Sequence, residues 1–357
     1  MDDLKESMGL FQKIKQDAYE KCLPIQATFE LTPRCALNCK MCYVHLRPEE
    51  IPKCGRGREL TADEWIEMGK QAREAGVLSL CITGGDPVLH PEFEKIWESI
   101  SRMGFRITLQ TNAFSITEKL EKLFYEYPPQ EAKITLYGSN NDVYWNVCQV
   151  ENGFTRVNEG IQKLRALKIP IQLLTTFVKQ NIEDKDNILK YAIANRYKWY
   201  YSTTCYPSLR GASTDARKCS LSAYDLGCSE KISKEWNKIP FMKKDTKPCE
   251  YCLGYRVSYN ITWDGYMRFC LFLNDPDIDV LEHSFEENWK DLQVYSKSIR
   301  WPKKCYICPV AEKCRKCIAS LACNNGGIEN LEENYCSNML HLLEIEKIGF
   351  SKESGGD

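Results

Sequence analysis

The chain has 357 residues, of which 43% are hydrophobic and 27% are charged, and its 48 Lys and Arg side chains nearly balance 49 Asp and Glu side chains. The formal net charge of −1 lacks the basic excess with which nucleic-acid binders neutralise phosphates, so we expect no nucleic-acid partner. Residues 1–23 lack the apolar stretch of a signal peptide, and no apolar run approaches ~20 residues, so we expect a cytoplasmic protein without a membrane span.

Cysteine is frequent, with 19 residues, and the cytoplasm keeps thiols reduced. The cysteines therefore argue against a disulfide framework and for metal ligation. Eight of them form a group of candidate ligands in the last third of the chain: Cys249, Cys252, Cys270, Cys305, Cys308, Cys314, Cys317 and Cys336.

After a lead-in at residues 1–25, short apolar segments alternate with amphipathic helices at intervals of roughly 30 residues, as in βα units. The segment Thr61-Ala-Asp-Glu64 has the pattern of a helix capping box, which marks one helix start. Consecutive βα units form a parallel sheet, so we predict an α/β fold with a partial (βα)6 TIM-like barrel at residues 26–204. The expected strands are Gln26–Leu31, Val77–Thr83, Phe105–Thr111, Lys133–Tyr137, Ile171–Phe177 and Trp199–Thr203.

Directly after the first expected strand, Cys35, Cys39 and Cys42 form a C-x3-C-x2-C run. A [4Fe–4S] cluster takes four thiolates, so three protein ligands leave one iron open for a small molecule. Open coordination positions are typical of catalytic rather than structural metal sites. A zinc site that also uses His45 is the alternative interpretation of this run.

The spacing of these three cysteines resembles the cluster motif of the radical S-adenosylmethionine (SAM) superfamily. The resemblance implies that the open iron binds the amino and carboxylate groups of SAM. It also implies that one electron from the cluster cleaves SAM into methionine and a 5′-deoxyadenosyl radical.

The second strand ends in Thr83-Gly84-Gly85-Asp86-Pro87, where two glycines allow close backbone approach and Asp86 suits an ammonium group. This run resembles the Gly-Gly-Glu element that binds the SAM amino group in the family, although Asp replaces Glu here. A simple β-to-α turn is the alternative.

Other strand ends carry polar residues that the resemblance places near SAM. Thr111 and Asn112 end the third strand, where the family has ribose or carboxylate contacts, although Asn112 also suits a turn. Tyr43 is a candidate for packing on adenine, and Ser139 follows the fourth strand. Cys205 follows the sixth strand and is either a reactive thiol that donates a hydrogen atom or a small apolar side chain.

Residues 205–248 are polar and weakly periodic, which is typical of a linker. Residues 249–340 are rich in cysteines and turns, so we expect metal to replace much of a hydrophobic core, and 341–357 form a tail. The C-x2-C pairs are equally compatible with zinc.

The cysteine spacing in residues 249–340 resembles the SPASM domain, which holds two auxiliary [4Fe–4S] clusters. By that resemblance, Cys249, Cys252, Cys270 and Cys317 bind the first cluster, and Cys305, Cys308, Cys314 and Cys336 bind the second. One spacing is a residue shorter than in the family, which makes Cys323 a competitor for Cys317.

The resemblance over both regions implies a radical SAM/SPASM oxidoreductase that abstracts hydrogen from a peptide. The leading expectation is a thioether or carbon–carbon crosslink in a ribosomally made precursor peptide. The alternatives are an anaerobic sulfatase-maturating (formylglycine-generating) enzyme, a peptide epimerase, and, from other classes, a multi-cluster electron carrier or a zinc-stabilised interaction module. Expected partners are a flavodoxin or ferredoxin-type electron donor and a separate leader-peptide-binding protein.

Overall fold

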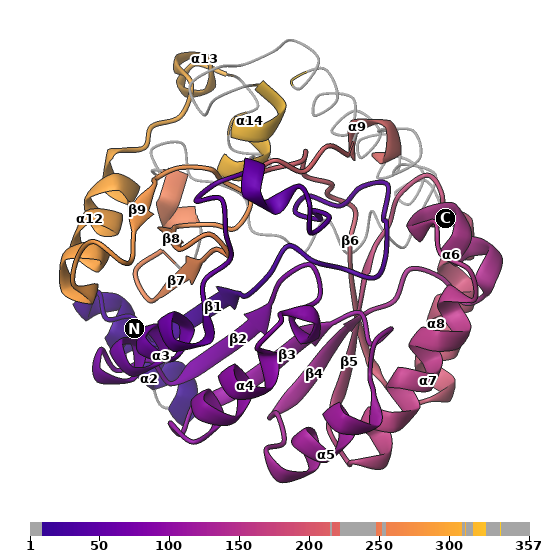
Figure 1. Cartoon of the computed structure of the whole chain (residues 1–357). Coiled ribbons are helices and arrows are strands. Elements are labelled where there is room, and N and C mark those ends of the chain that lie inside the picture. Colours follow the sequence, from indigo (N-terminus) through magenta and orange to yellow (C-terminus); the bar gives the residue numbers. More distant parts are fainter. Residues whose placement is uncertain are drawn as a thin grey trace.

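The structure, a computed structural model, describes residues 9–214, 216–221, 248–251, 255–308, 311, 317–325 and 336. Its centre is a sheet whose order in the described part of the chain is β6-β5-β4-β3-β2-β1-β7-β8-β9. Neighbouring strands from β1 to β6 are parallel, which confirms the predicted partial barrel (Figure 1). These strands are β1 (Gln26–Glu30), β2 (Ser79–Thr83), β3 (Arg106–Thr111), β4 (Glu131–Thr135), β5 (Ile171–Thr176) and β6 (Lys198–Ser202).

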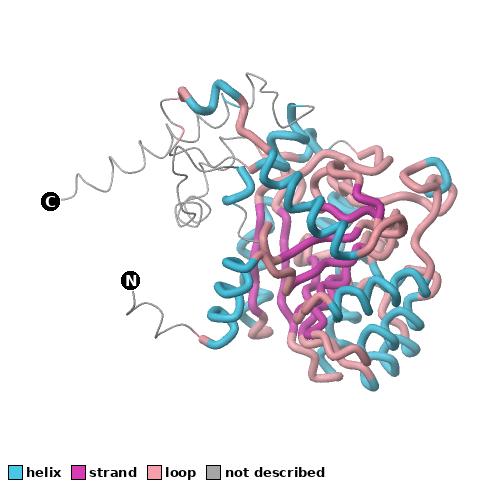
Figure 2. The backbone as a smooth tube through the Cα atoms, turned by 90° about the vertical axis from the view of Figure 1, so that its left-hand side faces the viewer, coloured by secondary structure: helices cyan, strands magenta, loops and turns pink. Residues whose placement is uncertain are grey.

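Helices cover the outer face of the sheet (Figures 1 and 2). Apolar side chains of the strands and helices form one buried core. Phe29 of β1 packs on Trp65 with ring centroids 5.2 Å apart, and Trp97 contacts Phe124 at 5.1 Å. The capping box predicted at Thr61 and Glu64 is present at the start of its helix. The helices of this region are α2 (Leu10–Lys21), α3 (Ala62–Glu74), α4 (Phe93–Ser101), α5 (Glu118–Glu126), α6 (Asn141–Cys148), α7 (Gly153–Ala166), α8 (Lys185–Ala194) and α9 (Ala216–Cys219), with short 3-10 turns η1 (Ile51–Lys53), η2 (Pro87–Leu89), η3 (Ile182–Asp184) and η4 (Pro248–Tyr251).

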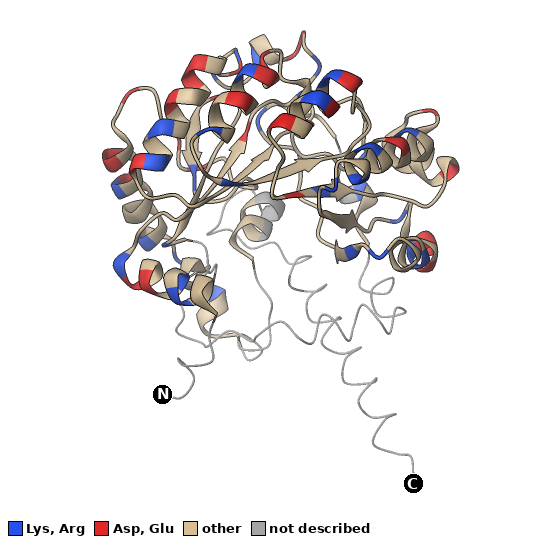
Figure 3. Cartoon of the chain, turned by 90° about the horizontal axis from the view of Figure 1, so that it is seen from below, with Lys and Arg blue, Asp and Glu red and all other residues tan. Residues whose placement is uncertain are grey.

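Charged side chains of both signs are interspersed over the outer helices (Figure 3). Ion pairs connect three pairs of helices: α3 with α4, α4 with α5, and α5 with α7. They are Lys95–Asp63 at 2.7 Å, Lys119–Glu94 at 2.6 Å and Lys163–Glu121 at 3.0 Å. None of the described helices has the length and apolar character needed to cross a membrane.

Three strands from the expected cluster region extend the barrel sheet beyond β1. Strand β7 (Ser258–Ile261) pairs in parallel with β1, and β8 (Tyr266–Arg268) and β9 (Ile278–Asp279) follow in antiparallel order. Tyr259, Ile261 and Met267 are buried in the same core as the barrel residues. Burial against β1 therefore gives these strands the core that we expected metal to replace. The described helices of this region are α12 (Phe285–Ser298), α13 (Lys303–Tyr306) and α14 (Ile318–Asn325).

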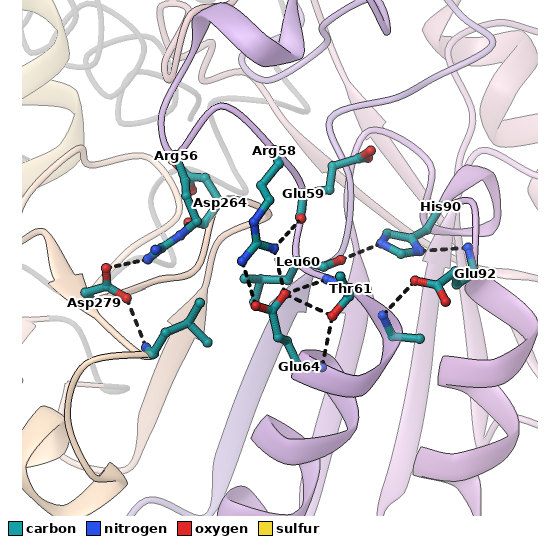
Figure 4. Close-up of polar contacts among 12 residues, drawn as sticks. Arg56, Arg58, Glu59, Leu60, Thr61, Glu64, His90, Glu92, Asp264 and Asp279 are labelled. Atoms are coloured by element: carbon teal, nitrogen blue, oxygen red, sulfur yellow. Dashed lines mark hydrogen bonds and ion pairs between the residues drawn. The ribbon is translucent and has the colours of Figure 1, made fainter.

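The loop between η1 and α3 fastens the added strands to the barrel (Figure 4). Arg56 Nε donates to the Asp264 carbonyl at 3.0 Å, and its guanidinium pairs with Asp279 at the end of β9. On the barrel side, His90 Nε2 lies 2.9 Å from the Leu60 carbonyl, while His90 Nδ1 accepts from the Glu92 amide at 3.1 Å. Since Nδ1 is an acceptor, Nε2 carries the proton and donates to Leu60.

Candidate active site

A cavity of about 450 Å³ opens at the carboxyl ends of the barrel strands. Nine of the eleven site residues predicted in the barrel line it, and they come from the end of β3 and from the loops that follow β1, β2, β3 and β6. These are Cys35, Cys39, Cys42, Tyr43, Gly84, Gly85, Thr111, Asn112 and Cys205.

The backbone of the cysteine loop is held from outside by the end of α6. The Asn38 amide donates to the Cys148 carbonyl at 2.9 Å, and the Lys40 amide donates to the Val147 carbonyl at 3.0 Å. These bonds lie on either side of Cys39, which is buried. The loop is therefore positioned by a helix that packs beside the barrel, and the three thiols face the cavity.

Burial raises the thiol pKa at all three cysteines. Desolvation is the largest cause at Cys35 and Cys42, where the Cys42 pKa rises to about 12. At Cys39 the largest cause is a hydrogen bond with Cys148, followed by desolvation. At neutral pH the thiols of the metal-free protein are protonated, so binding of iron must displace their protons.

The thiols are suited to a cluster rather than to one metal ion. The ligands of a zinc ion all bind one atom, and His45 is not among the described residues that line the cavity with Cys35, Cys39 and Cys42. A [4Fe–4S] cluster has a different requirement, because each thiolate binds its own iron atom. Three cysteines that line one cavity of about 450 Å³ are compatible with that requirement.

Two glycines allow the backbone after β2 to approach the cysteine loop. A Cβ on Gly84 would lie 2.5 Å from the Thr32 carbonyl oxygen, and one on Gly85 would lie 2.5 Å from the Arg34 carbonyl oxygen. The Gly85 and Asp86 amides donate to those same two carbonyls, at 2.7 and 2.8 Å. Only glycine fits at these two positions, and the contact fixes the start of the cysteine loop.

Asp86 lies one layer behind the cavity wall and is fully buried. The Thr111 hydroxyl donates to Asp86 Oδ1 at 2.6 Å, while Oδ2 has no partner among the described residues. Desolvation raises the Asp86 pKa to about 7, although bonds from the Thr111 hydroxyl and the Val88 backbone oppose the shift. An unpaired buried carboxylate oxygen beside Gly84 and Gly85 fits the cationic group of a ligand.

The structure turns Ser139 away from the cavity and toward η3. Its amide donates to Asp184 Oδ2 at 2.6 Å and its hydroxyl donates to Asp184 Oδ1 at 2.9 Å. Both polar groups of Ser139 are therefore engaged in holding the loop after β4. Tyr137, two residues earlier, is the side chain of this loop that lines the cavity.

Beside the predicted Tyr43, the cavity wall contains two aromatic residues, Tyr206 and Phe272, that the motifs did not indicate. Phe272 contacts Tyr43 edge-on with ring centroids 4.9 Å apart and stacks on Tyr206 at 3.9 Å. All three side chains line the cavity. The sequence signal that could have found Tyr206 and Phe272 is their position next to Cys205 and two residues after Cys270.

Of the predicted auxiliary ligands, Cys249 is buried, Cys270, Cys305, Cys308 and Cys336 are partly buried, and Cys317 is exposed. The Cys317 sulfur lies 3.9 Å from the Tyr206 hydroxyl on the cavity wall. Cys252 and Cys314 fall outside the described residues, as does the side chain of Cys323, together with most of the expected linker and the tail at 341–357.

Comparison with known proteins agrees with this geometry. Residues 29–192 match the model of the radical SAM superfamily. The chain is 25% identical to the "AdoMet-dependent heme synthase" of Methanosarcina barkeri over 88% of this chain and 96% of that protein. It is also 25% identical to the "PqqA peptide cyclase" of Ruegeria pomeroyi over 48% of this chain and 44% of that protein.

Solved structures share the fold at low sequence identity. Streptococcus suis SuiB bound to its precursor peptide SuiA superposes with a TM-score of 0.65 at 15% identity, covering 91% of this chain and 79% of SuiB. The enzyme anSMEcpe with bound AdoMet gives a TM-score of 0.65 at 16% identity, covering 94% of this chain and 100% of the other. These structures extend the agreement in fold over most of the chain.

Proposed function

We propose that this chain, whose residues 29–192 belong to the radical SAM superfamily, is an iron–sulfur oxidoreductase that modifies a peptide. The superfamily implies a [4Fe–4S] cluster and SAM as cofactors. When bound, they supply a 5′-deoxyadenosyl radical able to remove hydrogen from an unactivated carbon. The observation that carries the proposal is the cavity at the carboxyl ends of the barrel strands, which is lined by three thiols and by Gly84 and Gly85, with the orphaned Asp86 carboxylate oxygen behind its wall.

Within the proposed site, the protein residues bind and orient the cofactors. Cys35, Cys39 and Cys42 would hold three irons, and the open side of the cavity leaves the fourth accessible. Asp86 would accept the ammonium group of SAM through its free oxygen, with its orientation set by Thr111.

The relative from Methanosarcina barkeri is named a heme synthase, so a tetrapyrrole is the competing substrate class. The absence of charge on the described cavity wall supports a peptide substrate instead. Not one of the described residues that line the cavity is charged, and its β5 and β6 side presents Thr, Ser and Tyr hydroxyls beside the aromatic wall. A substrate rich in carboxylates would need cationic partners when it leaves water. A neutral peptide segment needs only hydrogen-bonding and apolar partners, which this wall offers. The names of the peptide cyclase and of the SuiB–SuiA complex agree with that choice.

For the reaction, we propose a thioether or carbon–carbon crosslink in a ribosomally made precursor peptide, with net loss of two hydrogen atoms. Residues 26–204 would act as the catalytic barrel, 205–248 as a linker and 249–340 as a SPASM region with two auxiliary [4Fe–4S] clusters that accept an electron from the substrate radical. A flavodoxin or ferredoxin-type protein would supply electrons, and a separate protein could bind the peptide leader. The near-balance of acidic and basic side chains argues against a nucleic-acid partner.

One observation favours peptide epimerisation as a second candidate. Cys205 lines the cavity, and desolvation raises its thiol pKa to about 11, so it remains a neutral thiol at pH 7. A protonated thiol is the form that can return a hydrogen atom to a substrate radical. Replacement of Cys205 by Ala separates the two reactions, because it would abolish epimerisation but leave crosslinking possible.

The experiment that tests the proposed function is anaerobic. The chain is reconstituted with iron and sulfide, reduced with dithionite in the presence of SAM, and 5′-deoxyadenosine is quantified beside the Cys35→Ala/Cys39→Ala/Cys42→Ala variant. We expect product only from the wild type. No product from the wild type, with and without candidate peptides, would contradict radical SAM chemistry, and the same assay with peptides identifies the modified residue by mass.

A further inference from the structure

The side-chain amide of Asn112 points its N–H group at a predicted cluster ligand. Asn112 Nδ2 donates to Cys35 Sγ at 3.3 Å. The orientation is unambiguous, because Asn112 Oδ1 accepts from the Phe114 amide at 2.8 Å and only the oxygen can fill that role. Asn112 is also buried, so water does not compete for the amide.

The turn that carries Asn112 is held in a sparsely populated backbone conformation. Ala113 has φ of 58°, in the left-handed region that disfavours residues with a Cβ. The Ala113 amide is tied to the Thr111 hydroxyl at 3.0 Å, and the Arg156 guanidinium lies 3.8 Å from the centre of the Phe114 ring. Packing on both sides therefore determines the direction of the Asn112 side chain.

Helix α7 makes this turn possible through one glycine. A Cβ on Gly160 would lie 1.9 Å from the Ala113 carbonyl oxygen and 2.9 Å from its carbonyl carbon. Both are backbone atoms that cannot move without shifting the turn. Gly160 is thus coupled to the Asn112 amide although it lies on an outer helix and does not line the cavity.

We propose that Asn112 is a positioning residue that raises the reduction potential of the cluster held by Cys35, Cys39 and Cys42, and that Gly160 maintains this effect from helix α7. The inference rests on the proposed function. Reduction adds negative charge to a cluster, so a donor to a ligand sulfur stabilises the reduced form more than the oxidised form. Loss of the N–H group therefore shifts the potential to more negative values.

The test is a redox titration monitored by electron paramagnetic resonance, which reads the potential rather than turnover. The relevant signal is the one whose shape changes when SAM is added, and its midpoint is measured without SAM. Asn112→Leu removes the donor without adding charge, whereas Asn112→Asp keeps an oxygen for the Phe114 amide, removes the donor and adds a negative charge near the sulfur, which shifts the potential in the same direction. Gly160→Ala changes no side chain around the cysteines chemically and acts by shifting the turn that carries Asn112. Gln110→Leu is the matched control, because Gln110 lies on the same strand and cavity wall but has no contact with a sulfur in the described residues.

We expect a more negative midpoint in both Asn112 variants and in Gly160→Ala, and the wild-type value in Gln110→Leu. Wild-type midpoints in Asn112→Asp and Gly160→Ala would overturn the inference, as would an equal shift in the Gln110 control. If an Asn112 variant fails to assemble its cluster, the Gly160 variant still decides. Absence of any SAM-sensitive signal in the wild type would instead overturn the proposed function and this inference together.

Discussion

At the scale of single residues, the approach of Gly85 to the cysteine loop is a contact that one methyl group would destroy. We expect Gly85→Ala to destabilise the protein by about 1–3 kcal/mol, the usual range for overpacking, and to lower iron loading at Cys35, Cys39 and Cys42. The reason is that the new Cβ meets the Arg34 and Pro33 carbonyl oxygens at 2.5 and 2.7 Å. The measurements are chemical denaturation and iron content after reconstitution.

Gly69→Ala is the control for that substitution. Its new Cβ meets side-chain atoms of Met103 and Ile100 at 3.0 and 3.3 Å, and the Met103 side chain is flexible. Helix α3 also gains from replacement of an interior glycine by alanine. Equal loss of iron in the two variants would show that the contact after β2 has no special role.

The free oxygen of Asp86 leads to a prediction about SAM affinity. We expect Asp86→Asn to weaken binding of SAM to the reconstituted protein by roughly tenfold or more, because a charge-assisted hydrogen bond is worth about 1.5–3 kcal/mol. Iron content should stay at the wild-type level, since Asp86 does not bind iron in the proposed site. Isothermal titration calorimetry under anaerobic conditions measures the affinity, and an unchanged dissociation constant in Asp86→Asn would remove Asp86 from the SAM site.

What the sequence can predict at this scale depends on how local the interactions are. The three cysteines Cys35, Cys39 and Cys42 are close in the chain, and Gly84 and Gly85 adjoin a strand end. Their places in the sequence were therefore enough to predict that they line one site. The partner of Ser139 is Asp184, which lies 45 residues away and competes for the hydroxyl. The stack of Tyr206 on Phe272 likewise joins distant segments, and no local sequence pattern predicts it.

At the scale of elements, the start of helix α3 depends on ionised Glu64. The pKa of Glu64 is lowered to about 2, first by the hydrogen bond from Arg58 and also by bonds from Thr61. A carboxyl whose folded pKa lies below its ordinary value stabilises the fold above that ordinary value, and the contribution is lost as pH falls toward the folded pKa. The loss should therefore occur between about pH 4.5 and pH 2.

We expect Glu64→Gln to lower the free energy of unfolding near pH 7 by about 1 kcal/mol or less, because the pair with Arg58 remains open to solvent. The difference from wild type should shrink below pH 4, as followed by urea denaturation at each pH. Glu287 caps α12 with Ser284 in the same way but has no arginine partner in the described part of the chain, so Glu287→Gln should show a smaller effect. A difference for Glu64→Gln that is constant with pH would contradict this account.

The six barrel strands were predictable because each is an apolar segment between helix boundary signals. Strands β7 to β9 were not, because β7 spans only residues Ser258–Ile261 and lies among cysteines and turn residues. Its pairing with β1, more than 200 residues earlier, is a tertiary contact that compensates for its short length. The cysteine spacing correctly drew attention to this region but said nothing about the sheet that carries it.

At the scale of the whole molecule, one buried ion pair joins four distant segments. Arg210 donates from Nη2 to both oxygens of Glu30 at 2.9 Å, and from Nη1 to the Leu271 carbonyl at 2.9 Å. The Tyr43 hydroxyl donates to Glu30 Oε2 at 2.9 Å. The end of β1, the cysteine loop, the segment after β6 and the loop after β8 therefore share one polar centre. Desolvation raises the pKa of Glu30, while Arg210 and Tyr43 oppose the shift and favour its ionised form.

Loss of one partner of the Glu30–Arg210 pair should lower the free energy of unfolding strongly, whereas loss of both should lower it only slightly. We expect Arg210→Met to destabilise the protein by about 3–5 kcal/mol, because Glu30 would remain in an interior without its cation. The Glu30→Met/Arg210→Met double variant should recover much of that loss, since two apolar side chains of similar length leave no buried charge. A double-mutant cycle by chemical denaturation measures the coupling. Additive effects would show that the two side chains act independently, in which case the hydrogen bonds to Leu271 and from Tyr43 would have to account for the order of the four segments.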